Sequence, residues 1–166
     1  MHEVLKKVEQ FGVVPVIKIE DANDAVPLAK ALCEGGLPCA EVTFRTEAAE
    51  AAIQTMREAY PDMLLIAGTV LTKEQADRAV SAGAQAVVSP GFNRKVVDYC
   101  VRKGILILPG CSCPSDMEQA IEAGLSAVKF FPAEASGGIK AIQAMAAPYG
   151  QLRFMPTGGV NAVNMQ

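Results

Sequence analysis

The segment SAGAQAVVS at residues 81–89 is repeated in form as EAGLSAVKF at residues 122–130. Each copy contains the end of a helical segment, then a glycine (Gly83 or Gly124), then a short apolar run. A glycine at this place can take the left-handed conformation that ends a helix. A short, β-branched apolar run closed by polar residues is typical of a buried parallel strand. The repeat therefore predicts parallel strands that alternate with helices.

Apolar runs of the same kind recur along the whole chain. Each is short, rich in β-branched residues and closed by Gly, Pro or polar residues. We therefore expect seven strands, which begin near Val13, Cys39, Leu64, Ala86, Ile105, Ala127 and Arg153.

The segments between these runs have helical spacing, and their ends carry the usual capping residues. Val96, Val97 and Cys100, for example, recur on one face of an expected helix. The N-cap residues expected at helix starts are Asp21, Thr72 and Asn93. The glycines expected at helix ends are Gly36, Gly83, Gly104 and Gly124.

Strict alternation allows either a doubly wound open sheet or a (β/α) barrel. The regular unit length, with an apolar strand in every unit, favours an α/β fold of the (β/α)8 TIM-barrel type, with residues 1–166 as a single domain. Units of about 23 residues would start an eighth strand at about position 176, past the last residue. We therefore expect a barrel truncated after the seventh strand, without the eighth βα unit.

Composition and charge exclude several classes of partner. The chain has 166 residues, of which 51% are hydrophobic, as expected of one globular domain. Fifteen basic and 18 acidic residues give a net charge of −3 without a basic run, which argues against nucleic acid as a partner. The apolar runs fall far short of the roughly 20 residues of a membrane helix, so no membrane is expected as a partner.

The N-terminus and the cysteines predict a cytoplasmic location. Glu3 and Glu9 lie among N-terminal lysines, and no apolar core with a small-residue cleavage site follows, so the segment does not read as a secretory signal. The five cysteines are odd in number and mostly lie in apolar segments. They are expected to be buried thiols of a reducing compartment, and we assign no disulfide.

Lys129 is the most informative single residue, because it interrupts the apolar strand AVKFFPA. Buried lysines are rare unless they are paired or functional. Burial favours the neutral amine, the form that attacks a ketone to give an imine. The structural alternative is a strand-end lysine that snorkels to water. Lys18, at the end of VVPVIK, is a competing lysine of the same kind.

The segment CAEVTFRT forms a second candidate group. Strand alternation places Glu41, Thr43 and Arg45 on one face, and the apolar residues between them on the other. A carboxylate inside a barrel can transfer protons, and an arginine can bind a substrate carboxylate with two hydrogen bonds. A buried Glu41–Arg45 ion pair with a purely structural role is the alternative.

Two weaker signals complete the set. AGTV places the hydroxyl of Thr69 at another strand end. PTGGV contains Gly158 and Gly159 between a strand and an expected helix, where free backbone N–H groups can bind phosphate. A tight turn without a ligand would have the same sequence.

Taken together, these segments resemble the 2-keto-3-deoxy-6-phosphogluconate (KDPG) and 4-hydroxy-2-oxoglutarate (KHG) aldolases, which are class I pyruvate aldolases. The matching stretches occur in family order from near Val13 to the end of the chain. They are VVPVI, EVTFRT, AGTVL, VSPGF, LPGCS, KFFPAE and PTGGV. Each is weak alone, but the combination is highly specific.

The resemblance implies a role for each candidate residue. Lys129 would be the Schiff-base lysine and Glu41 the proton-transfer residue. Arg45 and Thr69 would contact the pyruvyl part of the substrate, and Phe131 would form a pocket wall. Gly158 and Gly159 would belong to the phosphate site. The resemblance also implies a homotrimer, a 2-keto acid substrate, no metal and no external cofactor.

The sequence departs from the family pattern at two places. The family's last strand, second phosphate-binding loop and C-terminal helices have no counterpart here. Cys111 and Cys113 in GCSCPSD replace an aliphatic residue and a threonine. We interpret them as small core residues, with a redox or metal site as the alternative.

A second hypothesis follows from the expected truncation. Strands at the open edges of a barrel have unpaired backbone groups that can recruit other chains. The chain would then be a catalytically silent barrel fragment or an assembly scaffold.

Overall fold

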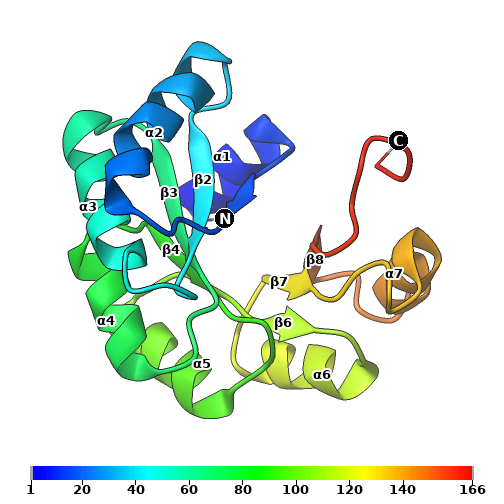
Figure 1. The fold of residues 1–166 in the computed structure, drawn as a ribbon. Coiled ribbons are helices and arrows are strands. Elements are labelled where there is room, and N and C mark those ends of the chain that lie inside the picture. Colours follow the sequence, from blue (N-terminus) through cyan, green and yellow to red (C-terminus); the bar gives the residue numbers. More distant parts are fainter. Residues whose placement is uncertain (1, 166) are drawn as a thin grey trace.

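The computed structural model describes residues 2–165 and has an α/β fold with parallel sheets (Figure 1). Within those residues the strands form one sheet of order β1-β2-β3-β4-β5 and another of order β6-β7-β8. The strands are β1 (Val16–Ile17), β2 (Cys39–Thr43), β3 (Leu64–Gly68), β4 (Ala86–Val88), β5 (Ile107–Leu108), β6 (Gly110–Cys111), β7 (Ala127–Phe130) and β8 (Arg153–Pro156).

Helices α2 to α7 follow one another around the outside of the strands (Figure 1). The helices are α1 (Glu3–Phe11), α2 (Ala25–Glu34), α3 (Ala49–Ala59), α4 (Lys73–Ser81), α5 (Arg94–Lys103), α6 (Pro114–Glu122) and α7 (Gly138–Ala146). A short 3-10 helix, η1 (Ala22–Asp24), precedes α2.

Alternation along the strands separates an outer from an inner core. On β3, Leu65 and Ala67 pack outward in a cluster that includes residues of the surrounding helices, such as Ile53 of α3. Leu64 and Ile66 point inward and pack with residues of the neighbouring strands and of α1. Inward residues of successive strands therefore face a common interior, as they do in strands that curve toward a barrel.

The expected strands are confirmed, with one division. The fifth run forms two short strands, because Pro109 lies between β5 and β6 and has no N–H to donate. The carbonyl of Pro109 still accepts a hydrogen bond from the Lys129 N–H at 3.0 Å, so contact with β7 continues across the break. The first run begins as a strand at Val16 rather than near Val13.

The sequence interpretation did not include α1. Val4 and Leu5 of this helix are buried against the inward-facing residues of the strands. Glu9 forms an ion pair with Arg153 of β8. The recurrence of Val4, Leu5 and Val8 on one helix face is the signal that predicts this helix.

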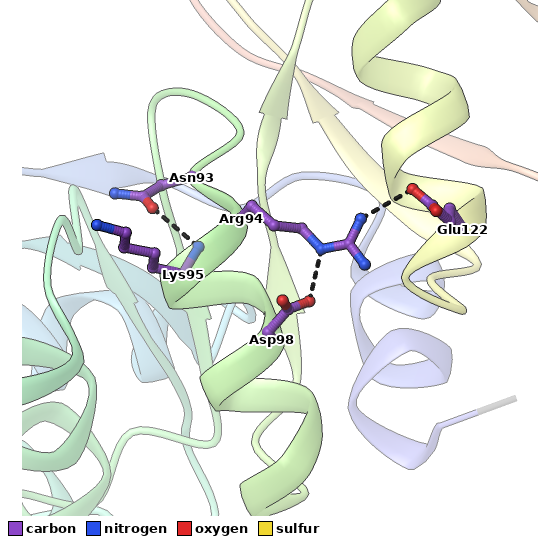
Figure 2. Close-up of polar contacts among 5 residues, drawn as sticks. All are labelled: Asn93, Arg94, Lys95, Asp98 and Glu122. Atoms are coloured by element: carbon purple, nitrogen blue, oxygen red, sulfur yellow. Dashed lines mark hydrogen bonds and ion pairs between the residues drawn. The ribbon is translucent and has the colours of Figure 1, made fainter.

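The predicted caps are confirmed. The side chains of Asp21, Thr72 and Asn93 accept backbone hydrogen bonds at the starts of η1, α4 and α5. The four predicted glycines all have positive φ. Beside the cap at Asn93, Arg94 binds Asp98 one turn on and Glu122 at the end of α6, which joins two consecutive outer helices (Figure 2).

Two strand edges lie at the ends of this arrangement. Among residues 2–165, β1 pairs only with β2, and β8 pairs only with β7. In the same part of the chain, no helix combines the length and apolar character needed to cross a bilayer.

Candidate active site

Lys129 and Glu41 form a buried ion pair. Lys129 Nζ lies 3.1 Å from Glu41 Oε1, and the two residues are only 5% and 1% exposed. The snorkelling alternative for Lys129 is therefore wrong, because its side chain points into the protein. An amine and a carboxylate in direct contact, shielded from water, can exchange a proton.

Strand alternation explains why both side chains point inward. Ala127, two residues before Lys129 on β7, belongs to the inner core, whereas Val128 and Phe130 pack outward against α6 and α7. On β2, Cys39 is likewise inward, and Glu41 follows it on the same face. Although β2 and β7 are not paired, the curvature of the sheets brings these two inward positions together.

Gly68 provides the space that the Glu41 carboxylate occupies. A β-carbon placed on Gly68, the last residue of β3, would lie 2.3 Å from Glu41 Oε1 and 2.8 Å from its Cγ. No side chain fits at that separation. Sequence reasoning missed this residue, because a glycine at a strand end also reads as an ordinary turn residue.

Phe131 connects the ion pair to the glycine-rich turn. Its ring centroid lies 5.4 Å from Lys129 Nζ, and a β-carbon on Gly158 would approach the ring to 3.3 Å. Phe131 is half-buried, directly after β7. It therefore forms a wall between the amine and the turn at Gly158 and Gly159.

A cleft of about 670 Å³ opens at this place. Glu41, Phe131, Gly158 and Gly159 line it, together with mostly apolar residues such as Met155. Its volume falls in the range of small-molecule sites. Four of the predicted site residues thus border one space, and Lys129 contacts two of them.

Arg45 lies apart from this cleft. It is exposed, and its Nε donates to Thr43 Oγ1 at 3.2 Å, while the Thr43 hydroxyl donates to the Ile17 carbonyl. Arg45 lines a second, polar cleft of about 490 Å³ with Gln75 and Arg78. The structural alternative, a buried Glu41–Arg45 ion pair, is wrong, because the inward carboxylate binds Lys129 and the arginine is exposed past the strand end.

Thr69 follows β3 directly and is half-buried. Its φ is +57°, a left-handed conformation that β-branched residues rarely adopt. Such backbone strain is common at functional sites. The strained turn at Thr69 directly follows Gly68, the glycine that leaves space for the Glu41 carboxylate.

The other sequence candidates lie elsewhere. Lys18 is exposed and pairs with Glu20, so it lacks the buried setting of Lys129. Cys111 is buried in the core, as predicted, but the interpretation of Cys113 as a core residue is wrong, because it is exposed at the start of α6. Among the residues that the structure describes, no group of three His, Cys, Asp or Glu side chains could hold a metal ion.

A buried lysine–glutamate pair beside a cleft, on parallel strands, is the arrangement that an aldolase acting through a lysine amine requires. Residues 3–166 match the family model for KDPG and KHG aldolase. The chain belongs to this aldolase family and is a lyase.

Curated relatives agree. The chain is 50% identical over 165 residues to the 2-dehydro-3-deoxy-phosphogluconate aldolase of Treponema pallidum, with 99% of this chain and 79% of the relative covered. It is 44% identical over 152 residues to the KHG/KDPG aldolase of Escherichia coli K12, with 92% and 71% covered.

A solved structure resembles nearly the whole fold. The KDPG aldolase of Zymomonas mobilis ZM4 with 3-phosphoglycerate superposes with a TM-score of 0.94 at 39% identity, over 99% of this chain and 78% of that one. The KDPG aldolase of Legionella pneumophila, with pyruvate captured as a covalent carbinolamine, has a TM-score of 0.88 at 39% identity, over 92% and 74%.

Proposed function

We propose that this chain is a Schiff-base aldolase that cleaves KDPG to pyruvate and glyceraldehyde 3-phosphate, and KHG to pyruvate and glyoxylate. The buried contact between Lys129 and Glu41 carries this proposal, because it places a nucleophile and a proton acceptor together beside a cleft. The names of the Treponema and Escherichia relatives favour this function over a silent fragment or an assembly scaffold.

The first half of the reaction forms the imine. Glu41 takes a proton from the Lys129 ammonium, and the neutral amine adds to the C2 ketone of the substrate. Glu41 then returns a proton to the carbinolamine hydroxyl, which leaves as water. The protonated imine that remains at C2 draws electrons from the C3–C4 bond.

The second half breaks the C3–C4 bond. The C4 hydroxyl gives its proton to Glu41, and C4 becomes the carbonyl carbon of the aldehyde. The electron pair of the C3–C4 bond forms a C2–C3 double bond, which turns the protonated imine into an enamine. A proton is returned to C3, and water hydrolyses the imine to release pyruvate and free Lys129. A carbinolamine with pyruvate was captured in the Legionella aldolase, which supports the same chemistry here.

The remaining predicted residues are assigned to substrate binding in the same proposal. Phe131, against the amine, would exclude water from the imine. Gly158 and Gly159 would bind the phosphate through backbone N–H groups, since both border the cleft and have positive φ. Arg45 and Thr69 follow β2 and β3, at strand ends where substrates of α/β enzymes bind, and the family resemblance assigns them to the pyruvyl carboxylate. Arg45 would reach it only after its side chain leaves Thr43 and the second cleft.

Three further predictions belong to this proposal: the (β/α)8 barrel form of the single domain, the homotrimer and the cytoplasmic location. The parallel strands with inward and outward cores and the Zymomonas superposition support the barrel form. The homotrimer and the location rest on the sequence and the family resemblance.

The direct test is pyruvate release from each aldol, followed by coupled reduction with lactate dehydrogenase. We expect turnover of both substrates by the wild-type chain and none by Lys129→Met. A folded wild-type chain that releases pyruvate from neither substrate would favour the silent alternative.

A further inference from the structure

Glu134 lies between two diglycine turns at the mouth of the cleft. It follows β7 by four residues and lines the cleft with Phe131. Its backbone N–H donates to the Gly158 carbonyl at 3.0 Å. The segment after β7 is thereby joined to the glycine turn after β8.

The aliphatic part of the Glu134 side chain packs directly on Gly159. A β-carbon on Gly159 would lie 2.6 Å from Glu134 Cβ and 2.7 Å from its Cγ, so the glutamate occupies the place that a side chain would take. Gly159 also has a φ of +81°. A glycine in such a turn has many alternative conformations, and packing on its α-carbon restricts them.

The carboxylate of Glu134 reaches the other diglycine turn. A β-carbon on Gly138, the first residue of α7, would lie 2.9 Å from Glu134 Oε1. The N-cap of α7, Gly137, offers no side chain to cap the helix. A negative charge near a helix N-terminus is favourable, which holds the glutamate in this position.

We propose that Glu134 is a positioning residue that fixes the Gly158–Gly159 turn for the phosphate of the substrate. The inference rests on the proposed function, which assigns phosphate binding to that turn. Loss of the Glu134 side chain would leave the turn free to move, and the cost of ordering it would fall on substrate binding. A phosphorylated aldol would bind less well, whereas an aldol without phosphate would be unaffected.

The test compares KM and kcat for KDPG and for KHG in Glu134→Ala, Glu134→Gln and a matched surface control, Glu34→Ala of α2. We expect Glu134→Ala to raise KM for KDPG by about tenfold at nearly constant kcat, with KM for KHG changed less than about twofold. Glu134→Gln keeps the stem that packs on Gly159 but loses the negative charge at the start of α7, so it should raise KM for KDPG by less than Glu134→Ala does. The Glu34 control should have the wild-type KM.

Other outcomes would overturn the inference. An unchanged KM for KDPG in Glu134→Ala, or equal changes for both substrates, would remove the positioning role. A lower KM for KDPG in both Glu134 variants would mean that the carboxylate only repels phosphate. If Glu134→Ala does not fold, Glu134→Asp decides, because its side chain is one methylene shorter and cannot keep both the packing on Gly159 and the reach to Gly138. It should give a KDPG-specific rise in KM, and an unchanged KM for KDPG would overturn the inference.

This experiment separates the inference from the proposed function. Trapping of pyruvate on Lys129 by borohydride needs no phosphate. A wild-type chain that traps no pyruvate contradicts the aldolase assignment. A chain that traps pyruvate and cleaves both aldols, without the KDPG-specific effect of Glu134→Ala, contradicts only the role of Glu134.

Discussion

Lys129 Nζ and Glu41 Oε1 are 3.1 Å apart, although the two residues are 88 positions apart in the chain. The pair lies between β2 and β7, which share no backbone pairing. Burying two charges costs free energy that their attraction only partly returns. The contact is therefore better explained by chemistry that needs both groups than by stability of the fold.

Replacement of Glu41 by glutamine should slow pyruvate release by about two to four orders of magnitude, because the amide cannot accept the Lys129 proton. The fold should persist, since glutamine has nearly the same shape and its carbonyl still accepts a hydrogen bond from Lys129. Steady-state kinetics and thermal melting measure the two effects. A variant that unfolds, yet turns over normally per folded molecule, would return Glu41 to a structural role.

Gly68→Ala should reduce turnover although it replaces neither Lys129 nor Glu41. The new β-carbon would lie 2.3 Å from Glu41 Oε1 and would displace the carboxylate from Lys129. Gly150→Ala is the matched control, because no atom lies within 4 Å of the position its β-carbon would take. Equal activity in the two variants would mean that turnover does not depend on the position of the Glu41 carboxylate.

The positions of the strands could be predicted from the sequence because buried parallel strands are short apolar runs between glycine and proline. The break at Pro109 could not be predicted, because the sequence does not distinguish a proline at a strand end from one that interrupts a strand. Helix α1 was missed although it is amphipathic, with Val4, Leu5 and Val8 on its apolar face.

The sequence predicted the members of the ion pair but not their contact. Alternation placed Glu41 and Arg45 on one face, which suggested a local pair. The strand ends before Arg45, and the curvature of the sheets brings Lys129 to the carboxylate instead. Neither curvature nor the space left at Gly68 is encoded in local spacing, so both required the three-dimensional structure.

Alkaline pH should weaken the fold through buried thiols. Burial raises the pKa of Cys39 and Cys100 from 9.0 to about 11, and that of Cys111 to about 12. Unfolded thiols lose their protons first as the pH rises past about 9, so the unfolded state gains stability between there and the folded pKa values. The stabilising contribution is complete below about pH 9.

Urea denaturation from pH 8 to 10.5 measures this effect. Between its unfolded and its folded pKa, each buried thiol should lower the free energy of unfolding by about 1.4 kcal/mol per pH unit. Cys39→Ala and Cys100→Ala should each reduce the slope, whatever they do to stability at pH 7. Identical slopes in wild type and variants would contradict the assignment.

Covalent trapping of pyruvate on Lys129 tests the central claim most directly. The protein is incubated with pyruvate and borohydride, and its intact mass and peptide map are recorded for wild type, Lys129→Met and Lys18→Ala. We expect one reduced pyruvate adduct per chain on Lys129 in the wild type and in Lys18→Ala, and none in Lys129→Met. An adduct on Lys18, or a folded wild-type chain that forms no adduct, would contradict the account.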